Sequence, residues 1–251
     1  RLELLTQIAR AQGLQRRFDD AHATLDSVED ALPGPAARVA VRYLLERGRV
    51  FNSSEQPARA LPLFESALAQ AASAGEDYLA IDAAHMLGIA APPADRLRWN
   101  LDAVAMAEKS ADPRARRWLA SLYNNIGWTC HDQGEYARAL EYFERALPLR
   151  EARGERVPIR IARWSIARAL RSLGRYDEAL AIQRALVAQL DRDHESDGYV
   201  AEELGELELA RGDADAARPW FARAARALGE DPVFVANEAA RLARLRKLGG
   251  L

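Results

Sequence analysis

The chain has 251 residues, of which 49% are hydrophobic and 29% are charged, a composition typical of a fully folded protein rather than a disordered one. A formal net charge of -2 excludes the overall basic field that draws a protein to nucleic acid or to an anionic membrane surface. The single cysteine, Cys130, excludes an internal disulfide framework and a metal site built from several cysteines.

Three sets of residues recur along the chain at a spacing of 38 to 40 residues. The first consists of small residues with one asparagine: Ala21, Ala60, Asn100, Ala139, Ala179 and Ala217. The second lies twelve residues before the first: Ala9, Gly48, Gly88, Gly127, Ala167 and Gly205. The third lies four residues after the first: Leu25, Phe64, Val104, Phe143, Gln183 and Phe221. Sets that keep phase over six units indicate a helical repeat protein.

These sets predict an all-α solenoid in a single domain covering residues 1–251. The predicted helix-turn-helix repeats cover residues 2–34, 36–74, 76–110, 113–153, 157–193 and 196–229, and a capping helix covers residues 232–247. The third repeat departs most from the pattern, because Asn100 occupies the alanine position and Pro92 and Pro93 interrupt the turn. We therefore expect a local kink in that repeat.

The fourth repeat carries the pattern most clearly. Ile126 and Cys130 lie four residues apart on the apolar face of its first helix. Gly134 ends that helix, because glycine tolerates the left-handed conformation that helix ends commonly need. We expect Gly127 and Ala139 to face each other, so that the paired helices approach closely.

The same repeat resembles a known family. Its small, glycine, aromatic and alanine positions match the tetratricopeptide repeat signature at Gly127, Gly134, Tyr136, Ala139, Phe143 and Ala146. The period of about 40 residues resembles the long-helix members of that family, whose usual period is 34 residues. The resemblance implies a right-handed α-α superhelix in which the first helix of each pair lines a concave groove, where the ligands are usually peptides.

The resemblance also implies which side chains point into that groove. We predict a ligand-binding set on the first helices, consisting of Arg49, His85, Asn124, Trp128, His131, Trp164, Arg168, Arg171, Tyr199 and Glu202. Exposed Trp, Tyr and Arg are the residue types enriched in binding hot spots, and arginine pairs bidentately with carboxylates. The predicted partner is therefore a protein or peptide segment, and whether that segment is acidic is left open.

Two structural alternatives remain open. The tryptophans could be buried between neighbouring helices, with arginine stems covering them. The charged residues could form an internal ladder of ion pairs between first helices, for example between Arg168 and Glu202.

The sequence contains few candidate catalytic or metal-binding residues. His85, His131 and Asp132 are the only set that could form a metal or acid–base site, but ~10 Å separates the two histidines along the axis. Phosphate-binding loops and the usual hydrolase and metalloprotease motifs are missing from the sequence. We predict a non-enzyme with neither metal nor cofactor.

The leading hypothesis is therefore a non-catalytic scaffold for protein or peptide segments. A regulatory domain of a larger protein that senses a ligand or peptide is the alternative, and an enzyme on a repeat scaffold is a remote third. We expect a cytoplasmic protein, because neither an apolar run of ~18 residues nor a signal peptide is visible. We expect no nucleic-acid or membrane partner, and self-association stays open.

Overall fold

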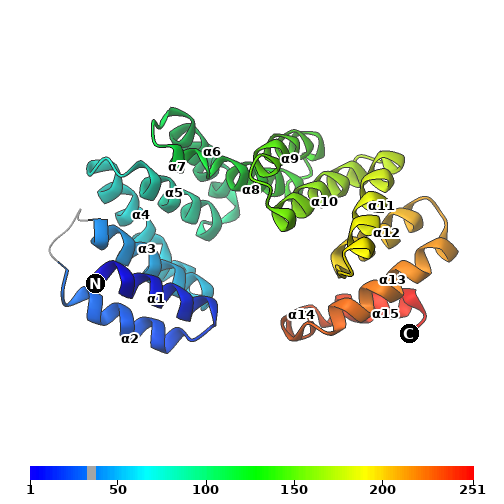
Figure 1. Cartoon of the computed structure of the whole chain (residues 1–251), viewed down its shortest axis with the longest axis horizontal. Coiled ribbons are helices and arrows are strands. Elements are labelled where there is room, and N and C mark those ends of the chain that lie inside the picture. Colours follow the sequence, from blue (N-terminus) through cyan, green and yellow to red (C-terminus); the bar gives the residue numbers. More distant parts are fainter. Residues whose placement is uncertain (33–37) are drawn as a thin grey trace. The chain divides into compact units, whose positions relative to one another are not determined.

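The computed structural model describes residues 1–32 and 38–251. Helices, turns and loops make up this part of the chain, and it contains no strand (Figure 1). The predicted all-α helical-repeat fold is confirmed. The predicted end of the first repeat at residue 34 and the start of the second at residue 36 lie outside the described residues.

The described chain forms two compact units, Arg1–Cys130 and His131–Leu251. The first unit contains α1 (Leu2–Leu14), α2 (Phe18–Glu29), α3 (Arg38–Ser53), α4 (Pro57–Ser73), α5 (Asp77–Ala90), α6 (Pro93–Lys109) and the short α7 (Pro113–Arg116). The boundary falls within α8 (Leu119–Asp132). The second unit contains α9 (Tyr136–Glu151), α10 (Arg156–Ser172), α11 (Tyr176–Arg192), α12 (Gly198–Ala210), α13 (Ala214–Gly229), α14 (Pro232–Asn237) and α15 (Ala239–Gly249).

The turn between the helices of a pair requires a left-handed residue at one position. Gly134 and Gly174 take it in the second unit, with φ of 80° and 75°. Arg16 and Glu55 occupy the same repeat position in the first unit, and their φ values of 60° and 63° are also positive. The predicted helix end at Gly134 therefore follows from backbone geometry that glycine adopts at the lowest cost.

Within a pair, the small residue of the first helix makes room for an aromatic ring of the second. A Cβ added to Gly48 would lie 2.5 Å from the ring of Phe64, and one added to Gly205 would lie 2.8 Å from the ring of Phe221. The two rings are fully or almost fully buried. In these repeats the close partner of the glycine is thus the aromatic residue of the third set.

The third repeat replaces this contact with another. Val104 stands where the second, fourth and sixth repeats have phenylalanine, and the side chain of Asn100 packs against Gly88. The Asn100 amide nitrogen donates to the carbonyl of Arg96 at 2.9 Å and to that of Gly88 at 3.4 Å. The turn is a short extended connection through Ala91 and Pro92, after which α6 begins, so the prolines set the turn rather than bend a helix.

The C-terminal segment differs from the single helix predicted over residues 232–247. Glu238, with φ of -122° and ψ of 32°, separates α14 from α15. The two helices bury different side chains, Phe234 from α14 and Leu242 and Leu245 from α15. A Cβ on Gly249 would lie 2.6 Å from the backbone nitrogen of Ala222, so α15 ends in close contact with α13.

Candidate functional site

The first helices of the two units carry two different surfaces. We call Arg10, Glu46, Arg49, Asp82 and His85 the ion-pair surface of the first unit, on α1, α3 and α5. We call Ile161, Trp164, Tyr199 and Val200 the aromatic surface of the second unit, on α10 and α12. Each surface lies within one unit.

The ion-pair surface links three neighbouring first helices. Arg10 pairs with Glu46 at 3.4 Å, and Glu46 accepts a hydrogen bond from Arg49 at 2.6 Å. The other guanidinium nitrogen of Arg49 donates to Asp82 on the next first helix. Glu46 and Asp82 are buried. The guanidinium of Arg49 is therefore held between two buried carboxylates of the same unit.

The charges of this surface depend on one another. Burial raises the pKa of Glu46, while Arg49 and Arg10 oppose that shift. Burial also acts to lower the pKa of Arg49, but Asp82 and Glu46 outweigh it and the pKa of Arg49 rises. The free-energy cost of burying such a charge is offset only while its oppositely charged partners are present. The network therefore holds the first helices together.

His85 lies at the end of this network as a neutral base. Burial lowers its pKa to about 4, and the nearby Arg49 adds to that shift. Its Nε2 lies 3.1 Å from the amide nitrogen of Asn125, which can only donate, so Nε2 is the acceptor and Nδ1 carries the proton. The His85 and Trp118 rings are 4.9 Å apart. At neutral pH this histidine is uncharged.

The aromatic surface surrounds an open pocket. The cavity has a volume of about 270 Å³, and its lining consists of Arg160, Ile161, Trp164, Asp197, Tyr199 and Val200. The indole nitrogen of Trp164 donates to the backbone carbonyl of Tyr199 at 3.1 Å, and the two rings meet edge to face at 6.4 Å. Ile161 and Tyr199 remain 43% and 41% exposed. The pocket thus has a fixed aromatic wall and accessible apolar rims.

Charged residues beside the aromatic surface are also paired. Arg171 donates twice to Glu203, at 2.5 and 3.1 Å, and Arg241 of α15 donates twice to Glu202, at 2.8 and 2.7 Å. A ladder of ion pairs is therefore present. Its partners differ from the example that the sequence suggested, because Arg168 lies 3.9 Å from Glu203 and Glu202 is taken by Arg241.

Arg168 is the least satisfied arginine of this group. Its guanidinium donates to the hydroxyl of Ser172 at 2.8 Å, and its nearest carboxylate is that of Glu203. Ser172 also contacts Nε2 of His131 at 2.9 Å. Burial, together with the adjacent Arg171, lowers the pKa of Arg168. An additional carboxylate here would relieve that electrostatic cost.

The ten residues of the predicted ligand-binding set divide between the units. The first unit holds Arg49, His85, Asn124 and Trp128, and the second unit holds His131, Trp164, Arg168, Arg171, Tyr199 and Glu202. Arg49 and Arg171 form ion pairs with carboxylates of their own unit, and Glu202 forms an ion pair with an arginine of its own unit. Asn124 and Trp128 lie half-buried on α8. Their roles in ligand binding stay predictions.

Sequence reasoning missed Glu46 and Asp82, the carboxylates that complete the network of the first unit, and the pocket residue Ile161. Glu46 was detectable, because it precedes Arg49 by three residues and so lies on the same helix face. Ile161 was also detectable, since it lies three residues before Trp164 on α10. No local signal identifies Asp82 as the partner of Arg49, because the two lie on different helices.

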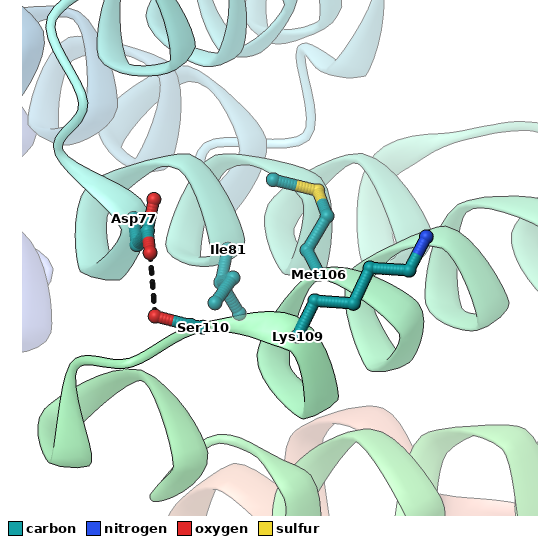
Figure 2. Close-up of a pocket in the computed structure, with 5 residues that line it drawn as sticks. All are labelled: Asp77, Ile81, Met106, Lys109 and Ser110. Atoms are coloured by element: carbon teal, nitrogen blue, oxygen red, sulfur yellow. Dashed lines mark hydrogen bonds between the residues drawn. The ribbon is translucent and has the colours of Figure 1, made fainter.

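A second cavity in the first unit, of about 250 Å³, lies between α5 and the end of α6 (Figure 2). Ser110 donates to Asp77 at 2.5 Å and accepts a hydrogen bond from the backbone of Asp112 at 3.1 Å. Figure 2 shows the Lys109 ammonium pointing away from this pair. Asp77 and Ser110 therefore tie α5 to the α6–α7 connection.

No group of three or more His, Cys, Asp or Glu side chains is placed to hold a metal ion in the part of the chain that the structure describes. None of the helices described is both long enough and apolar enough to span a membrane.

Comparison with known families matches the repeats directly. One tetratricopeptide repeat model matches residues 98–152, and a second tetratricopeptide repeat model matches residues 131–195. The chain is a tetratricopeptide repeat protein. Tetratricopeptide repeats generally mediate protein–protein interactions, and proteins built from them are generally non-catalytic scaffolds. No curated protein sequence matches the chain.

Solved tetratricopeptide repeat structures share the fold. A signal-transduction ATPase with a tetratricopeptide repeat sensor from Pyrococcus horikoshii aligns over 99% of this chain and 38% of its own, with a TM-score of 0.73 and 14% identity. The apo form of RapI aligns over 97% and 73%, with a TM-score of 0.71 and 12% identity. PilF of Pseudomonas aeruginosa aligns over 95% and 97%, with a TM-score of 0.64 and 16% identity. At these identities the likeness concerns the fold.

Proposed function

We propose that this protein is a non-catalytic scaffold that binds a protein or peptide segment on the aromatic surface of its second unit. The observation that carries this proposal is the open pocket between Ile161, Trp164 and Tyr199, whose rims remain exposed. A cavity of about 270 Å³ accommodates one large apolar side chain. Exposed aromatic residues around such a pocket are the usual anchors of protein–protein recognition.

The fixed geometry of the pocket supports this role. The hydrogen bond from Trp164 to the carbonyl of Tyr199 holds the indole in one orientation before any ligand arrives. A ligand therefore loses less conformational freedom of the receptor on binding. Arg160 pairs with Asp197 at 3.0 Å among the residues that line the pocket, so one charged pair lies beside the exposed apolar side chains of Ile161 and Tyr199.

The neighbouring arginine favours an acidic ligand residue. Arg168 lies one helical turn after Trp164 on α10, and its pKa is lowered by burial and by Arg171. A ligand carboxylate there would form a charge-assisted hydrogen bond with the arginine that the ion-pair ladder satisfies least. The preferred segment is thus one with a large apolar side chain that anchors in the pocket and an acidic residue nearby.

A displayed library of random peptides, selected on the purified chain, tests this proposal. We expect enriched peptides to share an apolar anchor and a nearby Asp or Glu. Ile161→Glu places a charge on the pocket rim, and we expect it to weaken binding of the selected peptides by about tenfold or more.

Ile89→Glu provides the matched control. Ile89 lies on α5 of the first unit and is 41% exposed, close to the 43% of Ile161. We expect Ile89→Glu to bind the selected peptides like the wild type, as measured by fluorescence polarisation. Binding that survives Ile161→Glu and disappears in Ile89→Glu would overturn the proposal and place the site in the first unit.

A further inference from the structure

A polar cluster continues the face of α10 that carries Trp164. Arg168 follows Trp164 by one helical turn, and Ser172 follows Arg168 by another. The guanidinium of Arg168 donates to the Ser172 hydroxyl at 2.8 Å, and that hydroxyl donates to the backbone carbonyl of Arg168 at 3.2 Å. Nε2 of His131, near the end of α8, lies 2.9 Å from the same hydroxyl. We call His131, Arg168 and Ser172 the polar cluster, and all three residues are half-buried.

The glutamates of the neighbouring first helix do not neutralise this cluster. Each of the four glutamates of α12 has another arginine as its closest partner: Glu202 has Arg241, Glu203 has Arg171, Glu206 has Arg244 and Glu208 has Arg184. The carboxylate of Glu203 lies 3.9 Å from Arg168 but already accepts two hydrogen bonds from Arg171. Among the described residues, therefore, no carboxylate accepts a hydrogen bond from Arg168.

The cations around the cluster oppose a proton on His131. The titratable groups around the imidazole are Asp132 of α8, Tyr136 of α9, and Arg168 and Arg171 of α10. Burial and then Arg168 lower the pKa of His131, Asp132 acts in the opposite direction, and Arg171 adds to the decrease. The imidazole is therefore neutral near pH 7, because a proton on it would place a second cation beside Arg168.

A ligand carboxylate would reverse this balance. An anion that binds Arg168 at the Ser172 hydroxyl also lies beside the imidazole, because both side chains contact that hydroxyl. An opposite charge within about 4–6 Å favours the charged form of a histidine and so raises its pKa. Coupling between two binding events is reciprocal. A carboxylate that raises the pKa of His131 must therefore bind more tightly once His131 is protonated.

We propose that His131, Arg168 and Ser172 form the subsite for the acidic side chain of the bound segment, and that His131 takes up a proton from solvent when this carboxylate binds. This inference rests on the proposed function, because the aromatic surface holds the apolar anchor about one helical turn away on α10.

The direction of the pH dependence follows from the two protonation states. The affinity is highest below the pKa of His131 in the free chain, and it decreases as pH rises through the higher pKa of the complex. Above both values the affinity no longer changes with pH. The side chains of Asp and Glu, with ordinary pKa values of about 3.9 and 4.3, stay ionised above pH 5.5. The dependence is therefore measured between pH 5.5 and pH 8.

Isothermal titration calorimetry with a peptide selected on the purified chain tests the proton uptake. The peptide contains one apolar anchor and one Asp or Glu, and both of its ends are blocked so that the side chain supplies the carboxylate. Two buffers with different enthalpies of ionisation are compared, because a proton taken from the buffer adds that enthalpy to the heat of binding. We expect a fractional proton uptake at pH 6.5 and an affinity that increases by about three- to tenfold from pH 8 to pH 5.5.

Two variants and one altered peptide provide the controls. His131→Gln removes the titrating group, so the proton uptake and the pH dependence should both disappear. His194→Asn should retain both, because His194 is exposed on the α11–α12 connection of the same unit and asparagine tolerates its positive φ of 56°. A peptide whose acidic side chain is replaced by the corresponding amide should bind the wild type more weakly and without proton uptake.

Proton NMR locates the proton directly. The imidazole resonance of His131 is assigned by its absence from the spectrum of His131→Gln, and we expect its pKa to be higher in the complex than in the free chain.

The outcomes separate this inference from the proposed function. Selected peptides that bind with the same affinity from pH 5.5 to pH 8 and without proton uptake would contradict the inference and leave the proposed function intact. Proton uptake that persists in His131→Gln would also contradict it, because another group would then accept the proton. A selection that yields no peptide sensitive to Ile161→Glu would instead exclude the proposed function, and this inference with it.

Discussion

The two units use the same repeat but expose different chemistry on their first helices. In the first unit, the buried carboxylates of Glu46 and Asp82 both pair with Arg49, so the charged groups of this surface already have partners within the unit. In the second unit, the arginines and glutamates also pair, but Trp164 and Tyr199 leave an open apolar pocket beside them. The repeat register determines which side chains face this surface. Whether they can accept a ligand depends on the partners that neighbouring helices supply.

The largest expected effect concerns the buried ion pairs. Arg49→Ala leaves the carboxylates of Glu46 and Asp82 buried without their main cation, and we expect it to reduce the free energy of unfolding by ~3–5 kcal/mol. Arg171→Ala in the second unit leaves Arg168 beside Glu203, so we expect a smaller loss of ~1–3 kcal/mol. Urea denaturation measures both. Equal losses in the two variants would contradict the distinction between the units.

The second prediction uses pH. The pKa of His85 is about 4 in the folded chain and near the ordinary 6.5 when unfolded. The unfolded state therefore binds a proton first as pH falls. The contribution of His85 to stability is present above pH 6.5 and is lost as pH falls toward 4, by about 3 kcal/mol.

Urea denaturation of the wild type and His85→Gln at several pH values measures this contribution as a difference. We expect the stability of the wild type relative to His85→Gln to fall between pH 7 and pH 4. His131→Gln is the comparison in the second unit, where burial and Arg168 also lower the pKa of the histidine. A relative stability of His85→Gln that does not change with pH would mean that His85 is not buried as a neutral base.

The third prediction compares one core position in the two units. Phe64 fills it in the second repeat, within the first unit, whereas Gln183 fills it in the fifth repeat, within the second unit, fully buried and without a hydrogen-bond partner for either amide atom among the described residues. Replacing this amide with an apolar side chain of similar volume removes the cost of burying it. We expect Gln183→Met to raise the free energy of unfolding by ~1–3 kcal/mol, measured by urea denaturation. A destabilised variant would show that the amide is satisfied in solution.

The smallest expected effect concerns the turns. The second unit places Gly134 at the left-handed position, whereas the first unit places Glu55 there. Glu55→Gly removes a steric cost in the folded state, which slightly exceeds the extra freedom of glycine in the unfolded state. We expect a gain of ~0.5–1 kcal/mol, and a loss of at least that size for Gly134→Ala. Thermal unfolding measures both, and changes of the same sign would contradict this account.

Much of the fold could be predicted from the sequence because its determinants are local or periodic. The glycines and alanines of the second set, the aromatic residues of the third set and the turn residue Gly134 recur at fixed spacing, and each has a direct steric meaning. Spacing also placed Trp164 and Tyr199 on the first helices. It did not predict that the C-terminal segment divides at Glu238, because the spacing of Phe234, Leu242 and Leu245 also fits one face of a continuous helix.

The sequence by itself therefore determined the repeat period, the helix pairs and the residues that lie on the first helices. Only the tertiary structure decided which of those residues are neutralised, as Arg49 is by Asp82 and Arg171 by Glu203, and which leave an accessible pocket, as Ile161 and Tyr199 do. The reason is physical. Helical periodicity sets the direction of a side chain, whereas its partners come from the offset between neighbouring helices, which depends on the packing of side chains distant in the sequence.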